Sequence, residues 1–177
     1  MNFDFTQSHF ALFALPPTFA LDRAQLDARY KALQSDYHPD RFASHDDATR
    51  RMSLQIATRV NEAYQTLKSP LARGRYLLTL AGVDTEEETN TAMPMDFLMA
   101  QMEWREAIAD TKTGRSVDAL EALNRDLAAE TDALTLELGA LIDVDRDYPA
   151  AAMAVRKLRF LEKLHEEIGD AIEAVLF

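Results

Sequence analysis

The sequence predicts an all-α protein built from two helical domains. Apolar residues recur at helical spacing along most of the chain, and no stretch alternates apolar and polar residues as a half-buried strand does. Only 5 of the 177 residues are glycine, and the composition is 47% hydrophobic and 28% charged, as in helical globular proteins. One polar, acidic and aperiodic stretch, "GVDTEEETNTAMP" (82–94), interrupts the pattern and marks the predicted boundary between the domains.

The first part of the N-terminal domain has strong helix start and stop signals. A short helix is expected over residues 8–15, halted by the proline pair that follows it. The next helix begins at a capping box, in which Asp22 caps and Gln25 follows three residues later. It should end near Tyr37, because Pro39 disfavours the α conformation in the residue before it.

A second long helix and a further short helix complete this domain. Asp46 and its neighbours can cap the long helix, and Ser69-Pro70 reads as the start of the short one, with Gly82 as its stop. The apolar stripe of the long helix is Met52, Ile56, Val60, Ala63 and Leu67. Two long helices joined by an irregular loop predict an antiparallel hairpin, with two shorter helices covering its apolar faces.

The second half of the chain contains three helical patterns. They run over residues 97–110, from Leu120 to Leu141 at near-heptad leucine spacing, and from about Pro149 to Val175. Such a set predicts a three-helix bundle. The predicted domains are therefore residues 1–82, an acidic linker at 83–93, and the bundle at 94–177.

Charge and composition exclude several classes of function. The formal net charge is −11, and the acids concentrate in one half: residues 1–82 hold 10 basic and 8 acidic side chains, residues 83–177 hold 9 and 22. This argues against a nucleic-acid partner, which requires clustered Lys and Arg. The chain contains no cysteine, which removes thiolate metal sites and fits a reducing compartment. No secretory leader is expected, and the apolar stretch at 10–21 is too short to span a membrane, so we expect a cytoplasmic protein.

The loop "SDYHPDRFAS" (35–44) between the long helices is the most unusual segment. His38 and Asp40 could act as an acid–base pair, but solvated helices flank the loop and the polar run "ASHDD" (43–47) follows it, where a catalytic pair would need apolar pocket walls that exclude water. With His45 they could bind a metal, although three groups on a polar loop make a weak site. A surface displayed to another protein fits better, because Pro39 fixes the backbone and lowers the entropy lost on docking.

Four cations near this loop would suit an acidic partner: Arg23, Arg29, Lys31 and Arg41. The same pattern is also that of an ordinary solvated helix face. Taken by itself, the pattern favours the ordinary solvated helix face.

The helix predicted at 97–110 has two apolar faces. At 100° per residue, Phe97, Trp104 and Ile108 share one face, which belongs in the core. The opposite side carries Leu98, Met99, Met102, Glu103, Glu106 and Asp110. A bundle helix with two neighbours can bury two faces, but the interspersed acids argue against burial. An exposed Leu/Met stripe edged with Glu is typical of an adaptable binding site, with Phe160 as a candidate aromatic anchor beside it.

The tripeptide His38-Pro39-Asp40 between two long antiparallel helices resembles the signature of J-domain co-chaperones. The likeness extends over nearly the whole chain to the HscB family of iron–sulfur cluster assembly. It is carried by "FALFALPPTFALD" (10–22), "NEAYQTLKSPLARGRYLLTLAG" (61–82), "DFLMAQMEWRE" (96–106) and "VRKLRFLEKL" (155–164). The chain departs from the family pattern at Ala14, where Gly is common, and at Arg41, where Lys is usual.

The resemblance implies a co-chaperone that is not itself an enzyme and has no cofactor or metal. A J-domain would bind a DnaK-class ATPase of the HscA type and stimulate ATP hydrolysis there, through His38, Pro39, Asp40, Arg41, Arg29 and Lys31. The bundle would bind the cluster scaffold protein, of the IscU type, through Leu98, Met99, Met102, Glu103, Glu106, Asp110 and Phe160. Two alternatives stay open: a J-domain co-chaperone with another client, and a small enzyme that uses His38 and Asp40.

Overall fold

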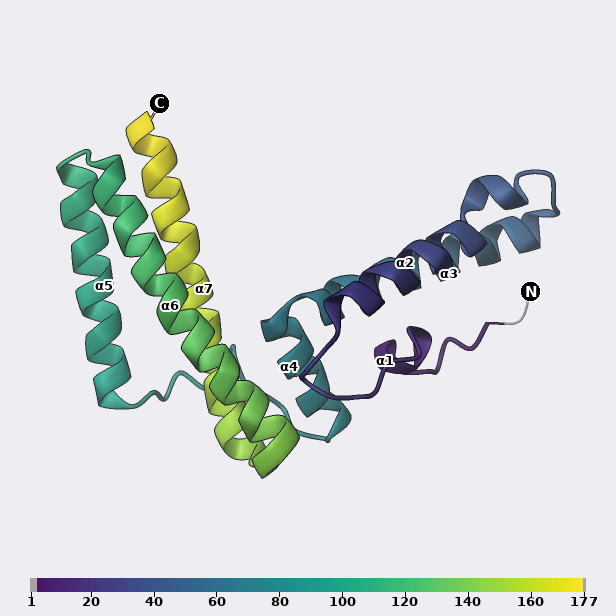
Figure 1. Ribbon diagram of the computed structural model, residues 1–177, viewed down its shortest axis with the longest axis horizontal. Helices are drawn as coiled ribbons and strands as arrows, with labels where there is room; N and C mark the ends of the chain where they lie inside the picture. The colour runs from purple at the N-terminus through teal and green to yellow at the C-terminus, as the bar shows by residue number, and fades with distance from the viewer. Residues whose placement is uncertain (1–2, 177) are drawn as a thin grey trace. The chain divides into compact units, whose positions relative to one another are not determined.

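The structure, a computed structural model, describes residues 3–176, and every regular element within them is helical (Figure 1). The all-α prediction is therefore confirmed. The chain divides into two compact units, Met1–Leu77 and Leu78–Phe177, called here the N-terminal and C-terminal units. Among the described helices, none is both long enough and apolar enough to cross a membrane.

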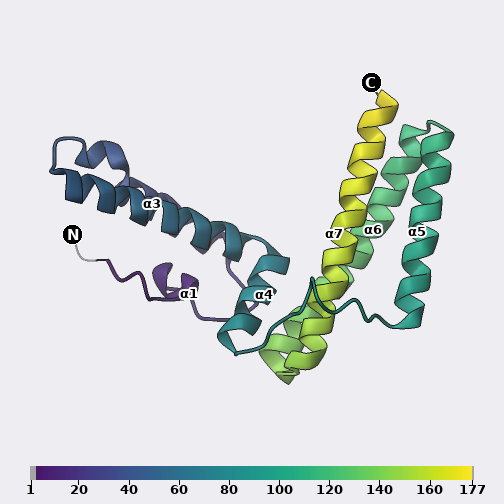
Figure 2. The same cartoon turned by 180° about the vertical axis from the view of Figure 1, so that it is seen from behind.

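The N-terminal unit is the predicted helical hairpin with shorter helices around it. Its elements are α1 (His9–Leu12), α2 (Arg23–Tyr37), the 3-10 helix η1 (Pro39–Phe42), α3 (Asp47–Lys68) and α4 (Pro70–Leu80), the last of which continues into the C-terminal unit. Helices α2 and α3 lie side by side and antiparallel, with α1 packed against α3 (Figures 1 and 2).

Most helix ends in this unit lie where the local signals predict them. The Asp22 carboxylate accepts the Gln25 N–H at the start of α2, and Asp46 does the same for Thr49 at the start of α3. Bonding to the Thr49 side chain, and then to its N–H, lowers the pKa of Asp46. After α4, Gly82 adopts φ 76°, the left-handed conformation that commonly ends helices.

Helix α1 is shorter than the predicted 8–15. Its start is capped by Ser8, whose hydroxyl accepts the N–H of Ala11. Two residues after the helix ends, Ala14 takes φ 50°, a left-handed conformation that directs the chain away from the helix before the proline pair is reached. The Arg29 guanidinium on α2 donates to the carbonyl oxygens of Phe13 and Ala14 and so holds this turn against the hairpin.

The two hairpin helices are held by a shared apolar core and by one polar cluster. Large, fully buried side chains in this unit are Phe10, Phe13, Leu26, Ile56 and Leu67. The rings of Tyr30 on α2 and Tyr64 on α3 stack at 3.9 Å between centroids. Asp27 accepts from Arg23 at 2.8 Å and from the Tyr64 hydroxyl at 2.9 Å, and these two hydrogen bonds lower its pKa. The contacts of Tyr64 with Asp27 and Tyr30 therefore fix the orientation of α2, which precedes the loop, relative to α3.

The C-terminal unit contains the predicted three-helix bundle. Its helices are α5 (Met95–Thr113), α6 (Val117–Ala140) and α7 (Tyr148–Leu176), with a π-helical turn η2 (Leu141–Asp145) between the last two. They run up, down and up beside one another (Figures 1 and 2). The buried core is Ile108, Leu120, Leu127, Leu161, Leu164, Ile168 and Ala171, with Phe97 and Trp104 packed against it. Phe97, Trp104 and Ile108 thus face the core as predicted.

The acidic segment before α5 is partly anchored within the C-terminal unit. Thr85 is buried, and its carbonyl oxygen accepts a hydrogen bond from Arg156 of α7 at 3.0 Å. The Arg156 side chain is itself buried, and its Nε lacks a hydrogen-bond partner. A buried guanidinium is costly when unpaired, so the Thr85 carbonyl contributes to the stability of this unit. Whether residues 1–82 and 94–177 are separate folding units stays a prediction.

Candidate functional site

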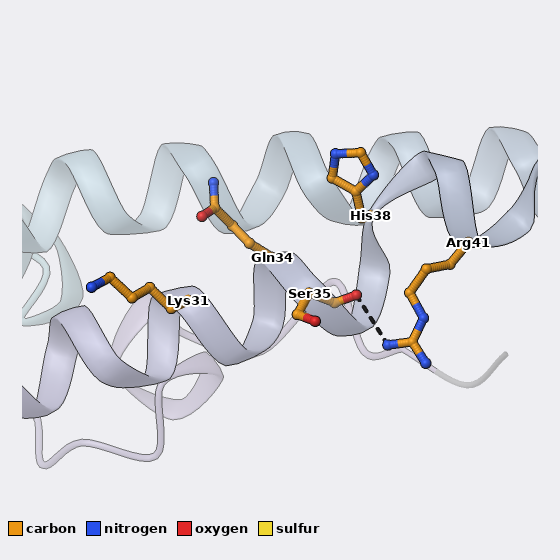
Figure 3. Close-up of a pocket in the computed structure, with 5 residues that line it drawn as sticks. All are labelled: Lys31, Gln34, Ser35, His38 and Arg41. Carbon is orange, nitrogen blue, oxygen red and sulfur yellow. Dashed lines mark hydrogen bonds between the residues drawn. The ribbon is translucent and has the colours of Figure 1, made fainter.

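Five side chains around the end of α2 line a shallow depression of about 560 Å³: Lys31, Gln34, Ser35, His38 and Arg41. This set, together with Pro39 and Asp40, is called here the loop surface. In Figure 3, Lys31, Gln34 and Ser35 extend from α2, whereas His38 and Arg41 come from the segment after it. The structure therefore brings the tripeptide and two of the predicted cations to one place.

His38 and Asp40 are oriented by a local hydrogen bond. The Asp40 backbone N–H donates to His38 Nδ1 at 3.3 Å, which caps the start of η1. An Asp40 carboxylate oxygen also lies 3.5 Å from Nδ1. In the neutral tautomer that accepts the Asp40 N–H, the ring proton is on Nε2, where it can be donated to a partner. The side chains are 57% exposed for His38 and 92% for Asp40. The loop thus presents one donor and one anionic acceptor to solvent, on a backbone constrained by Pro39.

The predicted cations of this region have different surroundings. Arg41 turns back and donates from Nη1 to the Ser35 carbonyl oxygen at 3.1 Å (Figure 3), and lies 3.6 Å from the Asp36 carboxylate. It therefore satisfies an otherwise free carbonyl in the last turn of α2. Lys31 is exposed. Arg29 is half-buried and bonded to the turn after α1, outside the lining of the depression.

The geometry favours display over catalysis or metal binding. A general acid or base works best where water is excluded, whereas His38 and Asp40 are exposed. His45 packs its ring against Phe42, 5.4 Å between centroids. Over residues 3–176, no group of three or more His, Asp or Glu side chains is arranged to bind a metal ion. The loop surface is therefore best suited to contacting another protein.

The second candidate surface lies on α5. Met99 and Met102 are 56% and 71% exposed, and Glu103, Glu106 and Asp110 are exposed beside them. The opposite face of the same helix carries the core contacts of Phe97, Trp104 and Ile108. We call the set Leu98, Met99, Met102, Glu103, Glu106, Asp110 and Phe160 the α5 surface.

Two members of the α5 surface are less exposed than the helical wheel suggests. Leu98 and Phe160 are half-buried, and the Phe160 ring on α7 meets the Phe97 ring edge-on at 6.4 Å. A wheel drawn for one helix does not include side chains that reach across from a neighbouring helix. Phe160 is therefore a partly packed ring at the edge of the surface rather than a free anchor.

One residue of this surface was missed by the sequence reasoning. A methionine at helical spacing more often fills a core, and the sequence alone favours that place for Met95; its side chain is instead 71% exposed, so that interpretation is wrong. It lies four residues before Met99 and seven before Met102, so it extends the same face by one turn. That spacing is visible in the sequence and is the signal that would have found it.

Two histidines outside these surfaces have structural partners. His9 is buried, its ring stacks on Tyr76 at 4.3 Å between centroids, and burial, aided by the charge of Arg59, lowers its pKa. His165 on α7 contacts α6, with its ring nitrogens 3.2 Å from Thr131 Oγ1 and 2.9 Å from Asn124 Oδ1. Burial also lowers the pKa of His165. No sequence pattern indicated the contacts of His9.

Comparison with known proteins gives consistent matches. A family model described as the HSCB C-terminal oligomerisation domain matches residues 93–169. A co-chaperone protein HscB homolog of Chromobacterium violaceum is 60% identical over 176 residues, covering 99% of both chains. Chaperone HscB from Vibrio cholerae superposes with a TM-score of 0.83 at 35% identity, covering 96% of this chain and 99% of that one. Human co-chaperone protein HscB gives 0.87 at 32% identity, covering 94% and 82%.

Proposed function

The chain belongs to the HscB family of J-domain co-chaperones, which serves iron–sulfur cluster assembly, and we propose that it links a DnaK-class ATPase of the HscA type to a cluster scaffold protein of the IscU type. The family predicted from the sequence motifs is thereby confirmed. A co-chaperone implies an Hsp70-type chaperone as a partner; the two named partners are the proposal. We place this activity in the cytoplasm, since a chain without cysteine suits a reducing compartment.

The proposed contact with the ATPase is the loop surface. His38 offers an outward N–H, Asp40 offers a carboxylate, and Pro39 keeps the offset between them constant. Lys31 and Arg41 add positive charge, which would speed association with an acidic face of the ATPase. Arg29 supports this contact indirectly, because it holds the turn after α1 against α2.

In this proposal the co-chaperone is not an enzyme. The reaction, ATP hydrolysis, takes place in the partner chaperone. Binding of the loop surface favours the conformation of the chaperone that hydrolyses ATP. Support comes from the exposure of His38 and Asp40, which leaves them to water rather than to an enclosed substrate site.

The proposed contact with the scaffold protein is the α5 surface. Met99 and Met102 supply flexible apolar area that adapts to a partner, and Leu98 and Phe160 supply partly packed area beside it. Glu103, Glu106 and Asp110 supply charge at its edge. Carboxylates that remain exposed at a rim add selectivity more than affinity.

One observation carries the proposal: the two units expose different kinds of surface, one polar and constrained, the other apolar and helical. The test measures steady-state ATP hydrolysis by an HscA-type ATPase with the co-chaperone alone, and then with the scaffold protein added. We expect stimulation by the co-chaperone and greater stimulation with the scaffold present. Stimulation that scaffold never alters, with no scaffold binding in calorimetry, would indicate another client. Turnover without any ATPase would indicate an enzyme.

A further inference from the structure

We propose that Met95, Met99 and Met102 form an oxidation site, at which peroxide converts the thioethers to sulfoxides and thereby releases the scaffold protein. The proposal that these three methionines oxidise first rests on their exposure and their places on α5, and not on the proposed function. Its regulatory consequence rests on the proposed function, because it requires the α5 surface to be the scaffold-binding surface.

The three methionines lie on one exposed face of α5. At 100° per residue, Met99 and Met102 lie about 40° and 20° to either side of Met95 around the axis of α5. All three side chains are more than half exposed. The other described methionines, Met52, Met93 and Met153, are half-buried, and Met1 lies outside the described residues.

Methionine is the only side chain of this protein that can carry reversible sulfur oxidation, because the chain has no cysteine. Hydrogen peroxide transfers one oxygen atom to the thioether: an S–O bond forms, the peroxide O–O bond breaks, and water leaves. The sulfur is oxidised by two electrons and the peroxide is reduced by two. Sulfoxide reductases, which draw on a thiol reductant, reverse the change.

Oxidation changes the chemistry of the surface rather than its shape. Each sulfoxide places a polar oxygen where an apolar partner surface would remove it from water, and an unpaired polar group in an interface opposes binding. The face already carries Glu106 and Asp110, whose carboxylates accept hydrogen bonds and cannot donate one to a sulfoxide oxygen. The core contacts on the opposite face of α5 are unaffected, so the bundle should stay folded.

The experiment treats the full chain with hydrogen peroxide, follows oxygen uptake at each methionine by peptide mass spectrometry, and measures scaffold binding by calorimetry. We expect Met95, Met99 and Met102 to oxidise several-fold faster than Met52, Met93 and Met153. Once these three are oxidised, Kd should rise at least tenfold, and sulfoxide reductase should restore it. Equal oxidation rates at all methionines, or an unchanged Kd after the three are oxidised, would overturn the proposal.

Two variants separate the site from general damage. In Met95→Leu/Met99→Leu/Met102→Leu, the ratio of Kd after and before peroxide should be close to one, whatever the starting Kd. In the control Met52→Leu/Met153→Leu, the ratio of Kd after and before peroxide should match that of the parent. If the triple variant instead shows the ratio of the parent, the three methionines are not the site at which oxidation weakens binding. The fluorescence of Trp104, the one tryptophan, reports whether the bundle stays packed.

Scaffold that fails to bind even the untreated parent would overturn the proposed function and the regulatory consequence together. The oxidation rates would then still decide whether the three methionines form a distinct site.

Discussion

The loop surface and the α5 surface are built by opposite means. The loop surface is irregular, and its geometry comes from hydrogen bonds within it: Asp40 N–H to His38 Nδ1, and Arg41 to the Ser35 carbonyl. The α5 surface is one side of a regular helix, held in place because the other side is packed in the bundle. The first presents a few directional groups and the second presents adaptable area.

The difference predicts how each surface responds to mutation. Directional recognition fails when one donor or acceptor is lost, since its partner group is left unpaired. Recognition through apolar area declines in steps as side chains are truncated, and a few of them dominate. Substitutions on each surface test whether the two surfaces behave in these two ways.

The largest expected effect follows from changing the loop. His38→Gln or Asp40→Asn should abolish stimulation of the ATPase, because Gln does not place a donor where the imidazole does and Asn replaces the anionic carboxylate with a neutral amide. Both side chains are largely exposed, so the melting temperature should stay close to that of the parent. Steady-state hydrolysis and thermal melts provide the two measurements.

A matched control is His45→Gln, which changes an exposed histidine close to the loop but outside the tripeptide. It should stimulate as the parent does. If either loop variant stimulates normally, or unfolds, the loop is not the directional surface described here.

Truncating α5 should give the next largest effect. Met99→Ala/Met102→Ala should weaken scaffold binding at least tenfold, because truncating even one anchor of this kind costs about 2 kcal/mol, or roughly 30-fold in Kd. Its stability should fall by no more than about 1 kcal/mol, since both side chains are exposed. Phe160→Ala should instead cost roughly 1–2 kcal/mol of stability, because that ring packs on Phe97. Calorimetry and chemical denaturation measure the two quantities.

Leu136→Ala serves as the control for exposed apolar area elsewhere, since Leu136 is an exposed residue of α6. Undiminished scaffold binding by the α5 double variant, or an equal loss in the α6 control, would show that the α5 surface contributes no more to binding than other exposed apolar residues.

Fragments of the chain test whether the two units, and with them the two surfaces, fold independently. Residues 1–82 and 94–177 should each show helical circular dichroism alone, because each contains its own core. A longer fragment, 83–177, should be more stable than 94–177 by about 1–3 kcal/mol, since only the longer one gives Arg156 the Thr85 carbonyl. Denaturant midpoints compare them. Loss of helicity in both short fragments would show a shared core, and equal midpoints would make the Thr85 contact unimportant.

The smallest expected effect concerns pH and affects the N-terminal unit. Burial and the charge of Arg59 lower the pKa of His9 in the folded state, opposed in part by Glu62. Below about pH 6.5 the unfolded chain therefore binds a proton at His9 that the folded chain does not. The contribution of His9 to the free energy of unfolding is thus fully present above that pH. It declines as the pH falls towards the lower pKa that His9 has in the folded state.

The variant His9→Phe keeps a ring against Tyr76 but cannot titrate. Melts of both proteins at pH 7 and pH 5 should show a smaller loss of melting temperature for the variant. His165 has a pKa shift of the same sign but is present in both proteins, so it cancels. An identical pH dependence would show that His9 does not contribute to acid sensitivity.

Local signals account for what could be predicted from the sequence. The starts of α2 and α3 follow from Asp22 and Asp46, and the end of α4 from Gly82, because each acts on backbone groups within a few residues. The exposed face of α5 follows equally from helical periodicity. These features are local, so one helix at a time suffices to find them.

Contacts between residues distant in the sequence account for what could not. The stacking of His9 on Tyr76 joins residues 67 positions apart, and the packing of Phe160 depends on a ring from α5. Likewise, the early end of α1 depends on a turn that Arg29 holds from another helix. A wheel or a capping rule describes one helix and contains no information on such neighbours.

The left-handed turn at Ala14 affects how this sequence can evolve. An L-residue with a side chain is strained there by about 1–2 kcal/mol, while glycine would lose roughly 0.5–1 kcal/mol through the greater freedom of its unfolded chain. Replacement of Ala14 by glycine is therefore expected to leave the free energy of unfolding nearly unchanged or to raise it slightly. Because Arg29 donates to the carbonyl oxygens of Phe13 and Ala14, a mutation at position 29 would remove the contacts that hold this strained turn against α2, and we expect the gain from glycine at position 14 to be larger in that background.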